Sequence, residues 1–273
     1  IKDLDQLDFF SVFVSHNSLI EKFSETLSSN AGLYFLLVIK DIFLSISLTS
    51  SLKLKFPLTD PKVIVFWKGV SGLNEMISST NLPVTVKTRI GYDNVEDYQN
   101  IYNFVSLLSK TGVKTFIMHA RKAMLGKFTP KQNLNIPPLK YDIVYKLKKD
   151  FPDLEIIING GISNIDQIKN HLKKIDGVMI GRSIYHSPYF LADIEKEIYS
   201  TEHISTREEV IKELISYVKV EIKKGTKLHH IMKHTLGLFH GISGSSYWKR
   251  YLSENMCVRN ADIQKVDHIL DKV

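Results

Sequence analysis

The chain has 273 residues, of which 44% are hydrophobic and 24% are charged, a composition that excludes a disordered or fibrous protein. Its single cysteine, Cys257, excludes an internal disulfide and favours a reducing compartment, either the cytoplasm or the interior of an organelle. The net charge of +7 favours a polyanionic partner but does not require one.

The composition changes near residue 80. Residues 1–80 carry seven Lys, no Arg and eight Asp or Glu, so the positive charge lies in the remainder of the chain. The most apolar stretch, residues 33–48, is divided by Lys40 and Asp41 into halves too short to cross a bilayer. We therefore expect a buried strand or helix there, no membrane span, and a boundary near residue 80.

From residue 83 onward, apolar β-branched runs alternate with stretches of helical spacing. Ser163 is the expected N-cap of the last of these helices, with Asp166 at its third position. Val- and Ile-rich strands that alternate with helices are typical of a parallel sheet buried on both faces. We expect strands over 83–89, 113–119, 154–159 and 176–182, and helices over 93–112, 140–152 and 163–175.

After about residue 200 the pattern predicts helices only. Thr206 and Glu209 form a capping box at the start of one helix, and Gly225 follows its end. We expect helices over 206–225, 227–239, 246–255 and 261–273. The sequence predicts three parts. Residues 1–65 form an unassigned segment, and residues 66–200 form half of an α/β barrel that opens with a helix over 66–80. Residues 201–273 form a helical domain.

Two consecutive predicted strands end in glycine, at Asn159-Gly160-Gly161 and at Gly181-Arg182. Glycine lets backbone amides approach an anion, and the helix that follows points its positive end there. TIM barrels often bind a phosphate on the loops after their last two strands. The pattern predicts a phosphate site in which Arg182 adds a charged donor; the alternative is that the glycines only permit tight turns.

Lys87 and His119 lie near the ends of the two preceding strands. In a barrel the carboxyl ends of the strands form the active face, where a lysine can neutralise negative charge and a histidine can bond a phosphate or carbonyl. The alternatives are a solvated strand end for Lys87 and a core residue for His119. Together with the glycine turns, the two side chains predict flavin mononucleotide (FMN) as the ligand.

Several stretches closely resemble the tRNA-dihydrouridine synthases of the bacterial A subfamily. They include "LPVTVKTRIGYD", the long "HARKA…PPL" segment, "DGVMIGRSIYHSPY" and "HTLGLFHGISGSSYWKRYLSEN", and the resemblance covers about residues 75–273. It implies a TIM barrel followed by a helical domain that grips tRNA. It also implies a hydride passed from reduced FMN to uridines 20 and 20a of the D-loop, with NADPH as the reductant of the flavin.

The resemblance assigns roles by position. Lys87 would contact the flavin ring, and His119 would lie beside the flavin and the phosphate. The phosphate would be held by Asn159, Gly160, Gly161, Gly181 and Arg182. The side chains expected to face tRNA are Arg121, Lys122, Lys131, Lys249 and Arg250. Basic stripes over 110–149 and 219–250 suit a phosphate backbone, although solvated helix faces would look the same. We expect Trp248 and Tyr251 to be helical core.

The first 80 residues depart from the family pattern. They lack the GCPS-type loop and the cysteine that protonates uracil in the family, and Cys257 matches no catalytic position, so no general acid is assigned. Four barrel strands need about 120 residues, so we expect residues 1–65 to be a truncated, spliced or mistranslated segment. The predicted fold is an incomplete TIM-type α/β barrel of which the last four strands are recognisable.

Two alternatives to this function remain open. A catalytically inactive tRNA-binding remnant would keep the basic helical domain without turnover. Another flavin barrel, such as dihydroorotate dehydrogenase, would share the phosphate turns but lack the HARKA segment. His230 and His234 have a spacing that can bind zinc, but no cysteine or carboxylate ligand stands near them, so we expect no metal site.

Overall fold

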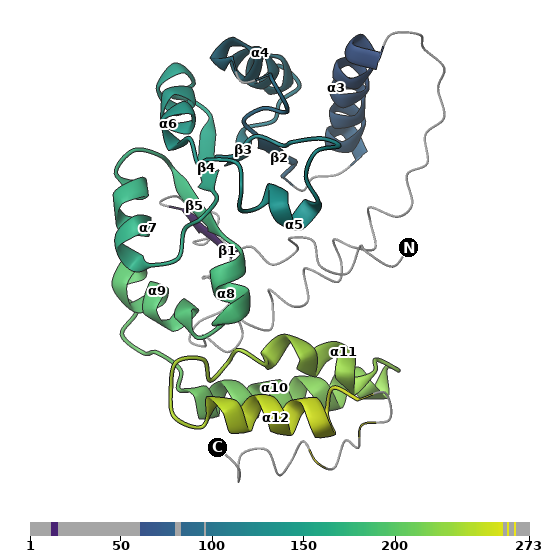
Figure 1. Cartoon of the computed structure of the whole chain (residues 1–273), viewed down its shortest axis with the longest axis vertical. Coiled ribbons are helices and arrows are strands. Elements are labelled where there is room, and N and C mark those ends of the chain that lie inside the picture. The colour runs from purple at the N-terminus through teal and green to yellow at the C-terminus, as the bar shows by residue number, and fades with distance from the viewer. Residues whose placement is uncertain are drawn as a thin grey trace. The chain divides into compact units, whose positions relative to one another are not determined.

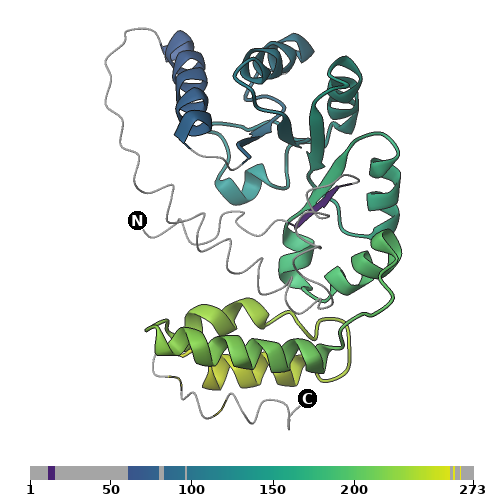
Figure 2. The same cartoon turned by 180° about the vertical axis from the view of Figure 1, so that it is seen from behind.

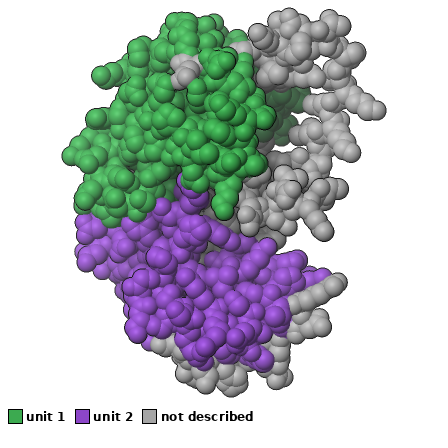
Figure 3. Space-filling model, viewed as in Figure 1, with its two compact units in different colours: residues 1–7, 13–17, 52–180 green, residues 8–12, 18–51, 181–273 purple. Residues whose placement is uncertain are grey.

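The computed structural model describes residues 12–15, 61–79, 83–95, 97–258, 261 and 265, with side chains from residue 70 onward. The alternation of strands and helices is visible from both sides of the molecule (Figures 1 and 2). The chain forms two compact units, and from residue 61 onward the first runs to Ile180 and the second starts at Gly181 (Figure 3). No helix in the described part combines the length and apolarity needed to cross a bilayer.

The first unit is built on a five-stranded sheet in the order β1-β5-β4-β3-β2. Neighbours from β2 to β5 pair in parallel, which confirms the four strands expected from the sequence. The strand expected over 176–182 was too long, because Arg182 already begins a helix. The strands are β1 (Val12–Ser15), β2 (Thr85–Arg89), β3 (Thr115–His119), β4 (Glu155–Asn159) and β5 (Gly177–Ile180).

Helices connect these strands. The helix expected from residue 93 starts later, because Asp93 has a φ of 43° and Tyr92 bridges to Val95 in a turn. Its N-cap is Asp97, whose side chain accepts from Gln99 N. The helices of this unit are α3 (Pro61–Ser79), α4 (Tyr98–Ser109), α5 (Pro130–Asn133), α6 (Tyr141–Asp150) and α7 (Ile165–Leu172).

The N-cap expected at Ser163 was wrong by one residue. The side chain of Asn164 accepts from Gln167 N at 2.9 Å, so Asn164 is the N-cap of α7. Ser163 instead donates its backbone N–H to Gln167 Oε1 at 2.8 Å. The two bonds resemble those of a capping box, except that the side chain of Gln167 accepts from the residue before the N-cap and not from the N-cap itself.

The two faces of the sheet differ. Side chains alternate between faces along each strand, so Phe116, Met118, Ile156 and Ile158 share one face, and all four are fully buried. This is the helix-covered face, since α6 packs against β4 and α7 against β5. The opposite face carries a small apolar cluster made by Ile117, Ile157 and Met179. In a barrel the opposite face is the interior, and it also carries the candidate site.

The second unit is helical. Its longest helix, α10, starts with the predicted capping box, in which Thr206 accepts from Glu209 N and Glu209 accepts from Thr206 N, and Gly225 follows with a φ of +93°. The predicted helix over 261–273 lies outside the described residues, apart from 261 and 265. The elements are α8 (Arg182–His186), α9 (Phe190–Tyr199), α10 (Arg207–Lys223), α11 (Leu228–Met232), η1 (Lys233–Thr235) and α12 (Ser245–Asn255).

The single helix expected over 227–239 was wrong. It ends as α11 at Met232, continues as the 3₁₀ helix η1 to Thr235, and then gives way to turns. Gly237 explains the break, since it packs so closely on the carbonyl group of His186 that a Cβ would lie 2.3 Å from that oxygen. The tertiary contact therefore outweighs the helical spacing.

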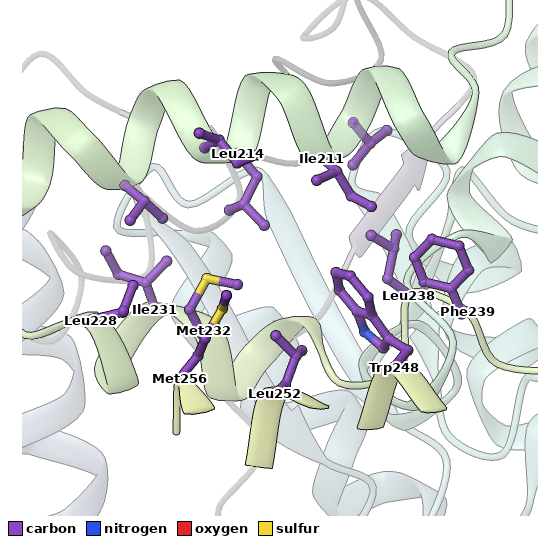
Figure 4. Packing of buried hydrophobic residues seen from close by; sticks show 13 residues of the cluster. Ile211, Leu214, Leu228, Ile231, Met232, Leu238, Phe239, Trp248, Leu252 and Met256 are labelled. Carbon is purple, nitrogen blue, oxygen red and sulfur yellow. The ribbon is translucent and has the colours of Figure 1, made fainter. Parts of the chain in front are cut away.

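The core of this unit lies between α10, α11 and α12 (Figure 4). Trp248 is 1% exposed, and its Nε1 donates to the carbonyl oxygen of Thr235 at 2.9 Å, which satisfies the one polar atom of the indole. Tyr251 is half-buried against the same cluster. Both residues were expected to be core rather than base-stacking platforms, and the packing confirms this.

Candidate functional site

Four polar side chains share the inner face of the sheet near the carboxyl ends of β2, β3 and β4. In the strand register Arg89 lies opposite His119, and His119 opposite Asn159. Lys87 stands two residues before Arg89 on the same face, opposite Ile117. Lys87, expected near the carboxyl end of its strand, is thus the middle residue of β2, and the last position of the strand belongs to Arg89.

His119 lies directly over the turn that follows β4. Its side chain is 8% exposed, and a Cβ on Gly160 would stand 2.8 Å from its Cδ2 and 2.9 Å from Cδ2 of Leu139. Gly160 and Gly161 both have positive φ, at +121° and +71°, which side chains rarely tolerate. The turn therefore requires both glycines for its conformation and packing. A tight turn was the alternative to phosphate binding that the sequence left open.

Close packing and phosphate binding are compatible in this turn. Among the residues that the structure describes, the backbone amides of Gly160 and Gly161 donate no hydrogen bond. The turn leads into α7 through Asn164, so the positive end of that helix adds to the local potential. Adjacent amides at a helix start form a concavity that suits an anion.

The segment between β3 and α6 folds back over this turn. Ala120 N donates to Asn159 O at 2.9 Å, and Lys140 N donates to Ala120 O at 2.8 Å. The guanidinium of Arg121 donates to the carbonyl oxygens of Asn135, at 3.2 Å, and Pro137. These bonds hold the residues before α6 against the ends of β3 and β4.

Sequence reasoning missed Arg89 as a site residue. Its Nη1 donates to the carbonyl oxygens of Lys122, at 3.2 Å, and Asn133, at 3.1 Å. The side chain of Asn133 in turn accepts from Met124 N at 2.7 Å. Arg89 therefore fixes the loop after β3. The sequence showed only an arginine at the last position of a predicted strand, which does not reveal the distant carbonyl groups that it bonds.

Gly181 and Arg182 belong to the second unit. Gly181 has a φ of −105°, which any residue can adopt, and it precedes the short helix α8. Arg182 is the exposed first residue of that helix. Their predicted role as phosphate ligands stays a prediction.

The basic residues expected to face tRNA divide into two kinds. Lys131, Lys249 and Arg250 are exposed, whereas Arg121 and Lys122 are half-buried near the site, and Arg121 bonds the loop carbonyls. Two lysines of the basic stripe over 110–149 form ion pairs within the protein. Lys148 pairs with Asp176 at 2.8 Å, and Lys146 pairs with Asp150 at 3.0 Å. The tRNA contacts stay predictions.

The titratable candidates of the second unit include His234 and Cys257. No group of three or more potential metal ligands occurs among the described residues. Burial lowers the pKa of His234 to about 4, and the positive charge of Lys233 and the neighbouring His230 act in the same direction. Cys257 is half-buried beside the helical core, and burial raises the pKa of its thiol.

The sequence is similar to known proteins over residues 69–273. Residues 69–273 match the model of the family described as dihydrouridine synthase. The tRNA-dihydrouridine(20/20a) synthase of Shewanella oneidensis is 44% identical over 195 residues, 71% of this chain and 58% of the relative. The enzyme of the same name from Escherichia coli strain K12 is 44% identical over 206 residues, 75% of this chain and 59% of the relative.

A third tRNA-dihydrouridine(20/20a) synthase, from Vibrio cholerae, is 41% identical over 200 residues, 72% of this chain and 61% of the relative. The chain thus spans about three fifths of the length of the curated relatives it matches. The matched residues begin in α3 and include β2 to β5 and the helical unit. The predicted α/β fold of TIM-barrel type is the fold of this family. The chain belongs to the dihydrouridine synthase family.

Proposed function

We propose that the chain is an FMN-dependent tRNA-dihydrouridine synthase, which reduces uridines 20 and 20a of the D-loop, with NADPH as the reductant of the flavin. The observation that carries the proposal is the packing of His119 over the Gly160–Gly161 turn, with Lys87 on the same face of the sheet. The single cysteine suits a reducing compartment, the cytoplasm or an organelle interior.

The residues present fit a flavin that carries a phosphate. The amides of Gly160 and Gly161 would bind the phosphate. Asn159 supports the turn, since its Nδ2 donates to Met179 O at 2.9 Å and so links β4 to β5. His119 would lie beside the flavin, and bound FMN would supply the hydride for the uracil ring.

Lys87 would act by its charge. It is an exposed ammonium group on a face whose centre is the apolar cluster of Ile117, Ile157 and Met179. A planar apolar ring can lie on such a surface, and a positive charge beside it stabilises the negative charge that builds on the ring as it gains electrons. The role of Lys87 is electrostatic and requires no proton transfer.

The tRNA would contact basic residues of both units. Lys131 on α5 and the adjacent pair Lys249 and Arg250 on α12 are exposed and suit phosphate contacts. Arg121 and Lys122 would contribute near the site. Binding through such residues weakens steeply as salt rises, since each phosphate contact releases a counterion. The target uridine would leave the base stack to reach the flavin.

A tRNA-binding protein without turnover is the second candidate. One observation favours it: the only cysteine, Cys257, packs against the helical core and has a raised pKa, so the chain shows no equivalent of the family's proton donor. This candidate keeps the basic surface and loses only the chemical step.

Dihydrouridine at positions 20 and 20a separates the two candidates. In tRNA from cells that lack the gene, we expect these positions to revert to uridine, and we expect the chain expressed from a plasmid to restore the modification. Mass spectrometry of tRNA fragments provides the measurement. Restoration by the Lys87→Ala variant at the wild-type level would argue against the electrostatic role, and full modification in the deleted cells would contradict the synthase.

A further inference from the structure

The hydroxyl of Tyr141 holds the peptide between the two glycines of the turn. It donates to the carbonyl oxygen of Gly160 at 2.7 Å. The same oxygen atom of Tyr141 lies 3.3 Å from the point where a Cβ on Gly161 would stand. Tyr141 is the first residue of α6, so a residue 19 positions earlier in the chain controls the turn after β4.

The orientation of this peptide decides where one amide points. A trans peptide is planar, so the carbonyl of Gly160 and the N–H of Gly161 point in opposite directions. A peptide flanked by two glycines can reverse at low cost, because glycine adopts both signs of φ. The bond from Tyr141 fixes the carbonyl on its own side and thereby directs the Gly161 N–H to the other side.

Tyr141 is itself held in place. Its ring meets His171 edge-on, with centroids 4.6 Å apart and an interplanar angle of 71°. His171 is 5% exposed, and its Nδ1 lies 2.8 Å from the hydroxyl oxygen of Tyr145. Burial raises the pKa of Tyr141, against an opposing effect of Arg121, so the hydroxyl keeps its proton as a donor.

We propose that Tyr141 is a positioning residue that sets the Gly160–Gly161 peptide so that the Gly161 N–H faces the phosphate of a bound flavin nucleotide. The inference rests on the proposed function, because the ligand is the one assigned there. It adds a residue that touches neither the flavin nor the uridine and acts only through the turn. The ring of Tyr141 packs against His171, so its removal as a whole would disturb the fold, whereas loss of the hydroxyl alone would not.

The test compares two ligands and two variants of the 273-residue chain. FMN and riboflavin differ only in the phosphate, so a residue that positions a phosphate-binding amide should affect FMN alone. Tyr141→Phe removes the hydroxyl and keeps the ring. Tyr98→Phe is the matched control, since its hydroxyl bonds Asp150 at 2.6 Å and not the glycine turn. Affinities are measured from the quenching of flavin fluorescence.

For Tyr141→Phe we expect FMN to bind about fivefold more weakly, the loss of roughly one hydrogen bond, with riboflavin affinity unchanged. Tyr98→Phe should bind both ligands like the wild type. Unchanged FMN binding by Tyr141→Phe, or an equal loss for both ligands, would overturn the positioning role while leaving the proposed function intact. A wild-type chain that binds neither ligand would contradict the proposed function itself, and the inference with it.

Discussion

Replacement of Trp248 by alanine is expected to lower the free energy of unfolding of the helical unit by about 3–5 kcal/mol, the range for large aromatic residues removed from a core. Trp248 is 1% exposed, and its ring centroid lies 4.7 Å from that of Phe239 (Figure 4). The replacement leaves a cavity between α10 and α12 and removes one of the two donors to the Thr235 carbonyl, the other being Leu238 N. Urea unfolding followed by circular dichroism provides the measurement.

Two further variants separate the causes. Trp248→Phe keeps an aromatic ring but removes Nε1, so it should cost less than Trp248→Ala, about 1–3 kcal/mol. Ser246→Ala changes an exposed residue of the same helix and should stay within about 0.5 kcal/mol of the wild type. A loss below about 1 kcal/mol for Trp248→Ala would show that α12 does not pack on α10 as described.

Replacement of Gly237 by alanine is expected to destabilise the same unit by roughly 3 kcal/mol, the upper end of the range for overpacking. The added Cβ would stand 2.3 Å from the carbonyl oxygen of His186 and 2.8 Å from its carbonyl carbon. Both atoms belong to the backbone, so no side-chain rotation relieves the clash. Hydrogen exchange should accelerate most at the end of α8 and in the turns after η1.

The matched control for this variant is Gly225→Ala. Gly225 has a φ of +93°, but no heavy atom lies within 4 Å of its added Cβ, so the cost is backbone strain alone, about 1–2 kcal/mol. Gly237→Ala should therefore be the more harmful change although its backbone is the less unusual one. The reverse order would indicate that the contact between Gly237 and His186 does not form.

Local sequence patterns predicted strands β2 to β5 and the longest helix of the second unit, α10, well. The β-branched runs at 115–119 and 155–159 and the box formed by Thr206 and Glu209 are signals complete within a few residues. The N-cap at Ser163 failed because two adjacent residues, Ser163 and Asn164, can both cap, and only the bond to Gln167 shows which one does. Local sequence patterns therefore predict which helices and strands form, but their first and last residues only to within a residue or two.

Contacts between residues far apart in the chain could not be predicted from local sequence patterns. The spacing of apolar residues runs unbroken past Gly237, although the helix ends earlier and Gly237 packs on the backbone of His186, 51 positions earlier in the chain. The same holds for the site, where Lys87 and His119 stood out by residue type but Arg89 and Tyr141 did not. Those two act on carbonyl groups 19 to 44 positions away, which no local pattern reveals.

The flavin content of the purified chain tests the central claim most directly. The turn at Gly160 and Gly161 beneath His119, with Lys87 on the same face of the sheet, should hold FMN without a covalent bond, at about one molecule per chain. His119→Ala should lose most of it, whereas His203→Ala, an exposed histidine of the second unit, should keep it. A chain that shows native circular dichroism yet neither carries FMN nor binds it when added would contradict the claim.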